Sequence, residues 1–240
     1  MKTISPEVTV GEVAATQPAS VRVFEAHGID FCCGGKKPLN EACRERNIDP
    51  DLLMREIETA VDGGAEERDW TKAEVNDLID HIISAHHAYL KTELPRLEAM
   101  LAKISSKHGE RHGQVLTPMA EVFGAMKQEL ESHLMKEEMV LFPLIRVLAE
   151  GRNAGDAEAK FHCGSVKNPL RVMFLEHDSA GDALARIRSL TGGYTPPEDA
   201  CNTFRACYWG LSELERDLHR HIHLENNILF PKAVALEAAS

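Results

Sequence analysis

Two stretches of the sequence repeat one arrangement of side chains that bind metal ions. In each stretch a histidine is followed four residues later by a glutamate, and a Phe-Pro pair begins five residues after that glutamate. The two copies are His133, Glu137 and Phe142-Pro143, and His221, Glu225 and Phe230-Pro231. Residues four apart share one face of an α-helix, so each copy presents an imidazole and a carboxylate together. A further histidine precedes each copy, His87 before the first and His177 before the second.

These six residues interrupt the apolar stripes of predicted helices. The stripe through the first copy, at alternating steps of three and four residues, is Met126, Leu130, His133, Glu137, Val140 and Leu144. Similar stripes pass through His87, His177 and His221. A lone imidazole or carboxylate buried in such a stripe is costly unless it is paired or bound to a metal. We therefore predict that two divalent metal ions lie between the helices, bridged by the two glutamates.

The donor set favours iron as the bound metal. Imidazole together with carboxylate suits iron, manganese or zinc. Two histidines per metal and two bridging glutamates leave coordination positions for oxo, water, O2 or NO, which suits redox and diatomic chemistry. We therefore expect two non-haem iron ions, that is, a di-iron centre with an oxo bridge. A His-Glu-x-x-His motif, which a zinc protease would need, is absent from the sequence.

Several neighbours of this set have more than one interpretation. His87 is preferred to the adjacent His86, because the helical register through His86 places a glutamate where an apolar residue is expected. Glu129 and Glu176 flank turns that carry predicted ligands. They could line an access path or relay protons, or they could be ordinary solvated carboxylates. The remaining nearby histidines are expected at the surface or as groups that orient a ligand ring: His81, His219 and His223.

Adjacent cysteines form a second candidate site. Cys32 and Cys33 stand in a glycine-rich loop next to Lys36 and Lys37. Positive neighbours lower the pKa of a thiol, so the pair could exchange disulfides or hold iron in transit. Two ordinary thiols are the alternative, and the residues alone leave both open. The six cysteines of the chain include no Cys-x-x-Cys pair, which argues against a zinc ribbon.

Composition excludes some classes of partner. The 240 residues are 43% apolar and 27% charged, as in an ordinary globular protein, and the net charge of −11 opposes binding to nucleic acid. No apolar run reaches the length of a membrane span, and the N-terminus lacks the apolar stretch of a signal peptide. We expect a cytoplasmic protein with no nucleic-acid and no membrane partner.

The elements that position the candidate ligands are expected to be helices throughout. A capping box at Thr71–Glu74 predicts the start of the first long helix, and Pro118 predicts the first turn of the second. The four long helices are predicted at about 71–105, 117–149, 168–191 and 197–235. Short links between long helices indicate an antiparallel four-helix bundle.

A small helical domain is expected before the bundle. Residues 1–64 form this domain, which carries the Cys32-Cys33 loop, and residues 65–240 form the bundle. The short helices are predicted near 18–27, 39–47 and 50–61. A glycine that follows His27 suits the C-terminal cap of the first of these helices. The fold class is therefore all-α.

Both candidate sites resemble those of a known family. Phe31-Cys32-Cys33-Gly34-Gly35-Lys36 is similar to the N-terminal signature of the iron-sulfur cluster repair di-iron proteins, also called the repair of iron centres family. The two His-Glu repeats, with Glu176-His177-Asp178 and Leu224-Glu225-Asn226-Asn227, resemble the hemerythrin-like domain of that family. The resemblance covers nearly the whole chain. The extra Cys43 and the insert at 151–165 depart from the family pattern.

The resemblance implies a bacterial cytoplasmic protein made under nitrosative or oxidative stress. It implies repair of damaged iron-sulfur clusters by iron donated from a labile di-iron centre. The family ligands correspond to the same six residues, His87, His133, Glu137, His177, His221 and Glu225. The family's double cysteine corresponds to Cys32 and Cys33 as functional thiols, and its acidic residues near iron channels correspond to Glu129 and Glu176.

Three functions remain open at this point. The first is iron donation, with damaged iron-sulfur proteins as recipients. The second is an enzyme that reduces NO to N2O at the di-iron centre, and the third is a module that binds or senses O2 or NO. A homodimer is left open as well.

Overall fold

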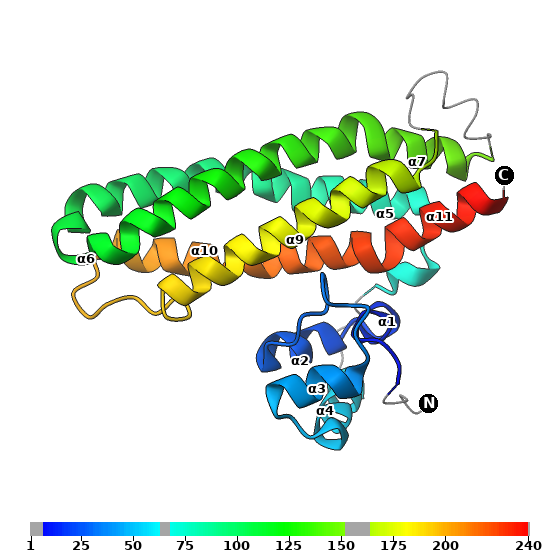
Figure 1. The fold of residues 1–240 in the computed structure, drawn as a ribbon, viewed down its shortest axis with the longest axis horizontal. Coiled ribbons are helices and arrows are strands. Elements are labelled where there is room, and N and C mark those ends of the chain that lie inside the picture. Colours follow the sequence, from blue (N-terminus) through cyan, green and yellow to red (C-terminus); the bar gives the residue numbers. More distant parts are fainter. Residues whose placement is uncertain (1–6, 63–67, 152–163, 240) are drawn as a thin grey trace.

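Long helices form an elongated bundle, and a group of short helices lies along one side of it (Figure 1). The computed structural model describes residues 7–62, 68–151 and 164–239. Over these residues the only strand-like pairing is an isolated bridge between Thr9 and Pro38, so the predicted all-α class is confirmed. The bundle elements are α5 (Val75–His81), η2 (Ile82–His87), α6 (Ala88–Lys136), η3 (Glu137–Leu141), α7 (Phe142–Ala149), α9 (Lys167–Leu190), α10 (Asn202–Leu224), η4 (Glu225–Leu229) and α11 (Phe230–Ala239).

Element α6 contains two antiparallel helices joined by a sharp bend. The bend lies at His112, whose φ of −118° and ψ of 15° are not helical, and Figure 1 shows the chain doubling back there. The prediction of a loop between residues 105 and 117 is wrong, because helix continues on both sides of this single bend. Pro118 accordingly lies inside a helix and does not begin one.

The second hairpin consists of α9 and α10 with its continuation in η4 and α11. The predicted limits of α9 agree with the structure to within a residue or two. Gly192, Gly193 and Tyr194 all adopt positive φ and turn the chain after α9. The last helix begins at Asn202, a few residues later than predicted. Most of the predicted insert at 151–165 lies outside the described residues.

Two apolar clusters fill the bundle, one towards each end. Leu97, Phe123 and Phe204 are central to the cluster at the bend. Phe142 and Phe230 are central to the other cluster. Burying a large apolar side chain contributes roughly 1.5 to 3 kcal/mol, so these clusters supply the main stabilisation of the bundle. The candidate ligands lie between these two clusters, on helices that pack into an apolar cluster on either side of the ligands.

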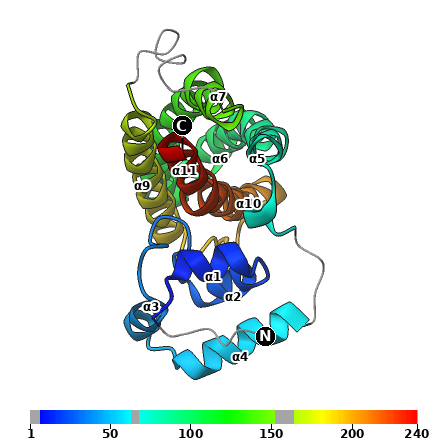
Figure 2. The same ribbon diagram turned by 90° about the vertical axis from the view of Figure 1, so that its right-hand side faces the viewer.

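The small domain contains four short helices around an apolar core, to which Ile222 of α10 also belongs. They are α1 (Val10–Thr16), α2 (Ser20–His27), α3 (Leu39–Arg46) and α4 (Pro50–Asp62). Three were predicted. Helix α1 was missed although Thr9 and Glu12 form a reciprocal capping box there. As predicted, Gly28 ends α2 in the left-handed conformation, with a φ of 63°. Figure 2 shows α1 and α2 between the bundle and the two outer helices.

The start of the first bundle helix differs from the prediction. Asp69 caps a short 3₁₀ turn, η1 (Trp70–Lys72), by accepting a hydrogen bond from the amide of Thr71. Helix α5 begins only at Val75, after Glu74 in an extended conformation. Among the described residues, no helix combines the length and the apolar character that crossing a membrane requires.

Candidate metal centre

The six predicted ligands converge at one point between the bundle helices. All are buried, with exposed fractions of 2% or less. Their donor atoms form two groups whose members lie within 4.8 Å of one another. The groups are His87, Glu137, His221 and Glu225, and His133, Glu137, His177 and Glu225. Both carboxylates belong to both groups, which is the arrangement expected of two bridged metal ions.

Each carboxylate turns one oxygen to each group. Glu137 Oε2 lies 3.4 Å from His87 Nε2, and Glu137 Oε1 lies 3.3 Å from His133 Nε2. Glu225 Oε1 and Oε2 lie 3.1 and 3.2 Å from Nε2 of His221 and of His177 respectively. The two Nε2 atoms within each group are close as well, at 3.2 Å for His87 and His221 and at 3.1 Å for His177 and His133.

These residues fit a metal pair better than they fit one another. Among the described residues, none of the four oxygens of Glu137 and Glu225 has a donor in hydrogen-bonding geometry. A buried carboxylate without donors is costly, and metal ions would satisfy all four oxygens together. Imidazole and carboxylate donors suit iron, manganese or zinc. The donor set therefore fits the predicted pair of metal ions.

Electrostatics keep the two carboxylates of this site negatively charged. Burial alone would raise the pKa of Glu225, but His221 and His177 outweigh it and hold that pKa well below its usual range. Burial likewise opposes protonation of His133, but Glu137 outweighs it and raises the pKa of His133 to about 9. The carboxylates are therefore ionised, and a cation would replace the proton on His133.

Three of the four imidazoles are oriented by hydrogen bonds through their Nδ1 atoms. His87 Nδ1 lies 2.8 Å from Glu138 Oε1, His133 Nδ1 lies 2.8 Å from Glu176 Oε2, and His177 Nδ1 lies 2.8 Å from Asn226 Oδ1. Such partners fix the ring and leave Nε2 free for a metal.

His221 is oriented in a different way. Its Nδ1 has no hydrogen-bond partner in the described part of the chain, and its ring lies parallel to that of His86 at 5.5 Å. His86 itself bonds through Nδ1 to Asp217 at 2.9 Å. The preference for His87 over His86 as the inward residue therefore agrees with their positions.

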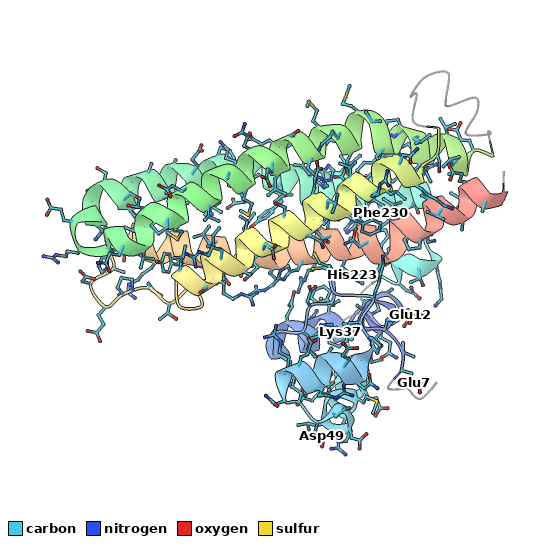
Figure 3. The ribbon with its side chains drawn as sticks, viewed as in Figure 1. Glu7, Glu12, Lys37, Asp49, His223 and Phe230 are labelled. Atoms are coloured by element: carbon cyan, nitrogen blue, oxygen red, sulfur yellow. The ribbon has the colours of Figure 1, made fainter. Side chains whose placement is uncertain are left out.

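The Phe-Pro pairs of the repeat serve the same site. Phe142 lies 5.5 Å from the ring of His87 and 24° from parallel to it, and Phe230 lies 5.9 Å from the ring of His177 and 3° from parallel to it. Figure 3 shows Phe230 inside the bundle. In each hairpin the phenylalanine of the repeat therefore packs on the upstream histidine and keeps water from one side of the site.

Three π-helical turns carry candidate ligands at their ends. Element η2 ends at His87, η3 begins at Glu137 and η4 begins at Glu225. A π-turn adds a residue to the helix and is frequent at functional sites. Nothing in the apolar periodicity predicted these turns.

Glu129 and Glu176 border one small cavity that reaches the ligands. The cavity has a volume of about 10 Å³, which is room for one water-sized molecule. Besides its contact with His133, Glu176 forms an ion pair with Lys136. Glu129 accepts a hydrogen bond from Ser179 Oγ at 2.9 Å. Both glutamates thus lie beside the candidate metal site, at its outer edge.

The double-cysteine loop of the small domain lies on the bundle next to a ligand. Cys33 Sγ is 3.6 Å from the backbone oxygen of His177, and the two sulfurs are 3.8 Å apart. Together with Asp30, the cysteines form a further group of potential metal donors. A cleft of about 820 Å³ opens beside this loop and is lined by both thiols and Asp178.

The expected lowering of the thiol pKa is wrong for Cys32. The hydrogen bond with Cys33, burial and the charge of Asp30 raise the pKa of Cys32 well above its usual value. The lysines do not oppose this effect, because Lys36 lies over the ring of Phe174 and Lys37 forms an ion pair with Glu45. Cys32 is therefore a protonated thiol until something displaces its proton.

Other histidines near the centre have mixed positions. His223 is buried against Phe31, with 5.6 Å between ring centroids, and Figure 3 shows it where the small domain meets the bundle. His81 stacks on Trp70 at 4.2 Å.

Sequence reasoning did not select Glu138 or Asn226, since a glutamate or an asparagine beside a ligand looks like one more solvated side chain.

Comparisons with known proteins agree with this geometry. Residues 78–233 match the family described as the hemerythrin HHE cation binding domain, and residues 6–61 match a domain of unknown function, DUF542. Proteins named iron-sulfur cluster repair protein YtfE from Dickeya chrysanthemi (strain Ech1591) and Yersinia pseudotuberculosis serotype IB (strain PB1/+) are each 38% identical over 226 residues, which cover 94% of this chain and 96% of theirs. The YtfE protein of Pectobacterium atrosepticum is 37% identical over 230 residues, with the same coverage. The chain therefore belongs to the YtfE family of iron-sulfur cluster repair proteins, with a hemerythrin-type cation-binding domain.

Proposed function

We propose that this chain repairs iron-sulfur clusters damaged by nitrosative or oxidative stress, acting in the cytoplasm as an iron donor. The names of its relatives and the match to a cation-binding family support this function. Its recipients would be damaged iron-sulfur proteins. The iron would come from a pair of non-haem iron ions with an oxo bridge, held by the six buried histidines and glutamates. When bound there, iron supplies redox chemistry and, as the ferrous ion, a cargo that other ligands can remove.

The surrounding side chains hold and shield this site. Glu138, Glu176 and Asn226 orient three imidazoles, and the two phenylalanines of the repeat keep water from two of them. His221 has no such hydrogen-bond partner among the described residues, so its ring is held less firmly than the other three.

The contact between Cys33 and His177 is the observation that carries the proposal. It places a pair of thiols, which bind iron as thiolates, on the backbone of a ligand. A thiol must lose its proton to bind the ion. Cys32 Sγ donates this proton in a hydrogen bond to Asp30 Oδ1 at 3.3 Å, and binding of the ion would displace it. Iron would pass from imidazole to thiolate and then to a recipient in the adjoining cleft.

Reactivation of a damaged cluster enzyme tests this function. A dehydratase with an NO-damaged [4Fe-4S] cluster is incubated with iron-loaded protein, with metal-depleted protein, or with the loaded Cys32→Ala/Cys33→Ala variant. We expect activity to return only with the loaded wild type. The matched control is Cys201→Ala, which removes an exposed cysteine at the bend end of the bundle and should repair normally. Full reactivation by the double variant would remove the thiols from the mechanism.

The small cavity beside the ligands supports a second candidate, NO reduction or reversible binding of O2 or NO. It is lined by His133, His177 and His221 and has room for one water-sized molecule. Conversion of two NO, two electrons and two protons to N2O and water can be measured by gas chromatography without any cluster protein. Catalytic N2O would favour the enzyme, whereas reversible binding without N2O and without iron loss would favour a binding module.

A further inference from the structure

One amide side chain joins the candidate metal site to the double-cysteine loop. Asn226 Oδ1 lies 2.8 Å from His177 Nδ1 and accepts the proton that this nitrogen carries when Nε2 faces a metal. The other end of the same side chain, Nδ2, donates to the backbone oxygen of Cys32 at 3.2 Å. Asn226 follows Glu225 directly at the start of the π-turn η4, so a single turn supplies a bridging carboxylate and this link.

The other half of the repeat shows what is particular about this position. The residue that follows Glu137 is Glu138, and it holds His87 as Asn226 holds His177. A carboxylate can only accept hydrogen bonds, and Glu138 uses its second capacity to accept from Lys91 on the surface. An amide accepts at one end and donates at the other. Of these two residues, only Asn226 can therefore link its histidine to a backbone carbonyl oxygen.

A second amide fastens the same loop without touching a ligand. Asn227 Nδ2 lies 2.9 Å from the backbone oxygen of Phe31 and 2.9 Å from His223 Nδ1. Its oxygen lies so close to Gly35 that a side chain there would not fit: a Cβ added to Gly35 would lie only 2.7 Å from Asn227 Oδ1. The loop is thus held at two successive carbonyls, of which one is connected to the candidate metal site and the other is not.

We propose that Asn226 is a positioning residue through which iron occupancy controls the docking of the Cys32-Cys33 loop, an inference that rests on the proposed function. Iron on His177 Nε2 fixes the ring and leaves the proton on Nδ1, so the amide oxygen stays with His177 and the amide nitrogen points at Cys32. Without iron the ring can carry its proton on Nε2 instead, which lies 3.2 Å from Glu225 Oε2, and Nδ1 then has no proton to donate to Asn226. The amide then loses its fixed partner, and an amide that turns over would set its oxygen against the carbonyl of Cys32.

This coupling gives iron delivery an order. The loop is docked while iron is present, so the thiols wait beside the ligand, and it loosens once iron has left His177. Because coupling between two sites is reciprocal, undocking of the loop also weakens the hold on iron. Return of an ion from the thiols to an emptied site is thereby disfavoured.

Hydrogen exchange measures docking without relying on the thiols, which iron itself could protect. The full-length chain is loaded anaerobically with Fe²⁺ alone or depleted with a chelator, and iron content is measured by elemental analysis. Exchange of the peptide 29–37 is then followed by mass spectrometry in both states. The two states of the wild type differ by one hydrogen bond from Asn226 to the loop. We therefore expect exchange to be roughly three- to tenfold slower in the iron-loaded than in the metal-depleted protein.

Three variants separate coupling from ordinary support of the fold. Asn226→Asp keeps an acceptor for His177 but removes the donor to Cys32. It should therefore retain iron, and the amides of peptide 29–37 should exchange at the same rate in the iron-loaded and the metal-depleted variant. Asn226→Ala should also lose the dependence on iron. Asn227→Ala, the matched control, should exchange faster in both states yet keep the wild-type ratio.

The outcomes distinguish this inference from the function on which it rests. The coupling is overturned if the wild type exchanges at the same rate with and without iron, or if Asn226→Asp keeps the wild-type ratio of the two exchange rates. This holds even if cluster repair succeeds. The expected ratios with no cluster repair leave the coupling standing and refute the repair function. A wild-type chain that retains no iron refutes both.

Discussion

The junction between the small domain and the bundle should be sensitive to acid because of one buried histidine. His223 is 5% exposed, packs against Phe31 and accepts a hydrogen bond on Nδ1 from Asn227. Burial penalises its charged form and lowers the pKa of His223 from the usual 6.5 to about 4, against a smaller opposing contribution from the backbone of Phe31. The folded protein therefore contains neutral imidazole here at pH values where the unfolded chain is protonated.

The sign and size of the effect follow from linkage. Between the usual pKa of 6.5 and the folded pKa of about 4 the unfolded state binds more protons, so stability is complete above 6.5 and is lost as the pH falls. The difference in pKa corresponds to about 3 kcal/mol in total, or about 1.4 kcal/mol per pH unit. Replacement of His223 by Gln keeps an acceptor near Asn227 and removes the titration.

Urea unfolding followed by circular dichroism compares the two proteins at pH 7, 6 and 5. Both are metal-depleted, so that the ligand histidines titrate alike and cancel in the difference. The free energy of unfolding of the wild type should fall relative to His223→Gln by about 1 to 2 kcal/mol between pH 6 and pH 5. Gln128→Ala, at an exposed position on α6 without a titratable side chain, is the control and should run parallel to the wild type. A difference between wild type and His223→Gln that is constant with pH would refute the reasoning.

Other expectations concern the ligands, a surface thiol and the metal. Changing His133 and His221 together to Leu should abolish metal binding and keep the helices, because both positions lie in apolar stripes. Elemental analysis measures the metal and circular dichroism measures the helices, and a variant that retains paired metal would contradict this expectation. Cys201 has a pKa lowered to about 7 by the amide of Phe204 and by His108, 3.3 Å away, so its alkylation should titrate near pH 7 and shift upward in His108→Gln, as peptide mapping would show. Chelation of iron should lower the Tm by about 5 to 10 °C, because a ligand at roughly a hundred times its Kd stabilises the native state by about 2.7 kcal/mol. Calorimetry measures this shift, and an unchanged Tm would contradict a metal that binds only the folded chain.

The positions of the six candidate ligands could be anticipated because two patterns coincide in them. Apolar periodicity showed which residues face inward, and the polar side chains His133 and Glu137 are conspicuous in a stripe that is otherwise apolar. The same periodicity selected His87 over His86. Helix ends were harder to predict. The bend at His112 involves one non-helical residue, and the adjacent Gly113 does not reveal how short the link is, because a glycine is compatible with a loop as well as with a helix.

Groups that act on the ligands could not be found in this way. Glu138 and Asn226 do not belong to any inward stripe, and their importance depends on a π-turn that shifts the helical register by a residue. The pKa of Cys32 was expected to fall because lysines are near in sequence, yet in space Asp30 and Cys33 are its neighbours. Such effects depend on contacts between segments far apart in the chain, which periodicity does not report.

The two halves of the repeat are alike in their ligands and unlike in what supports them. Glu176, which precedes His177, accepts from His133 in the other hairpin. The matching residue before His87 is His86, which stacks on His221 and leaves its Nδ1 without an acceptor. A carboxylate partner raises the basicity of an imidazole and strengthens its hold on a metal. The histidines and glutamates of the repeat thus form two similar groups of candidate ligands, but their flanking residues hold one group more firmly and connect it, through an amide, to the thiols.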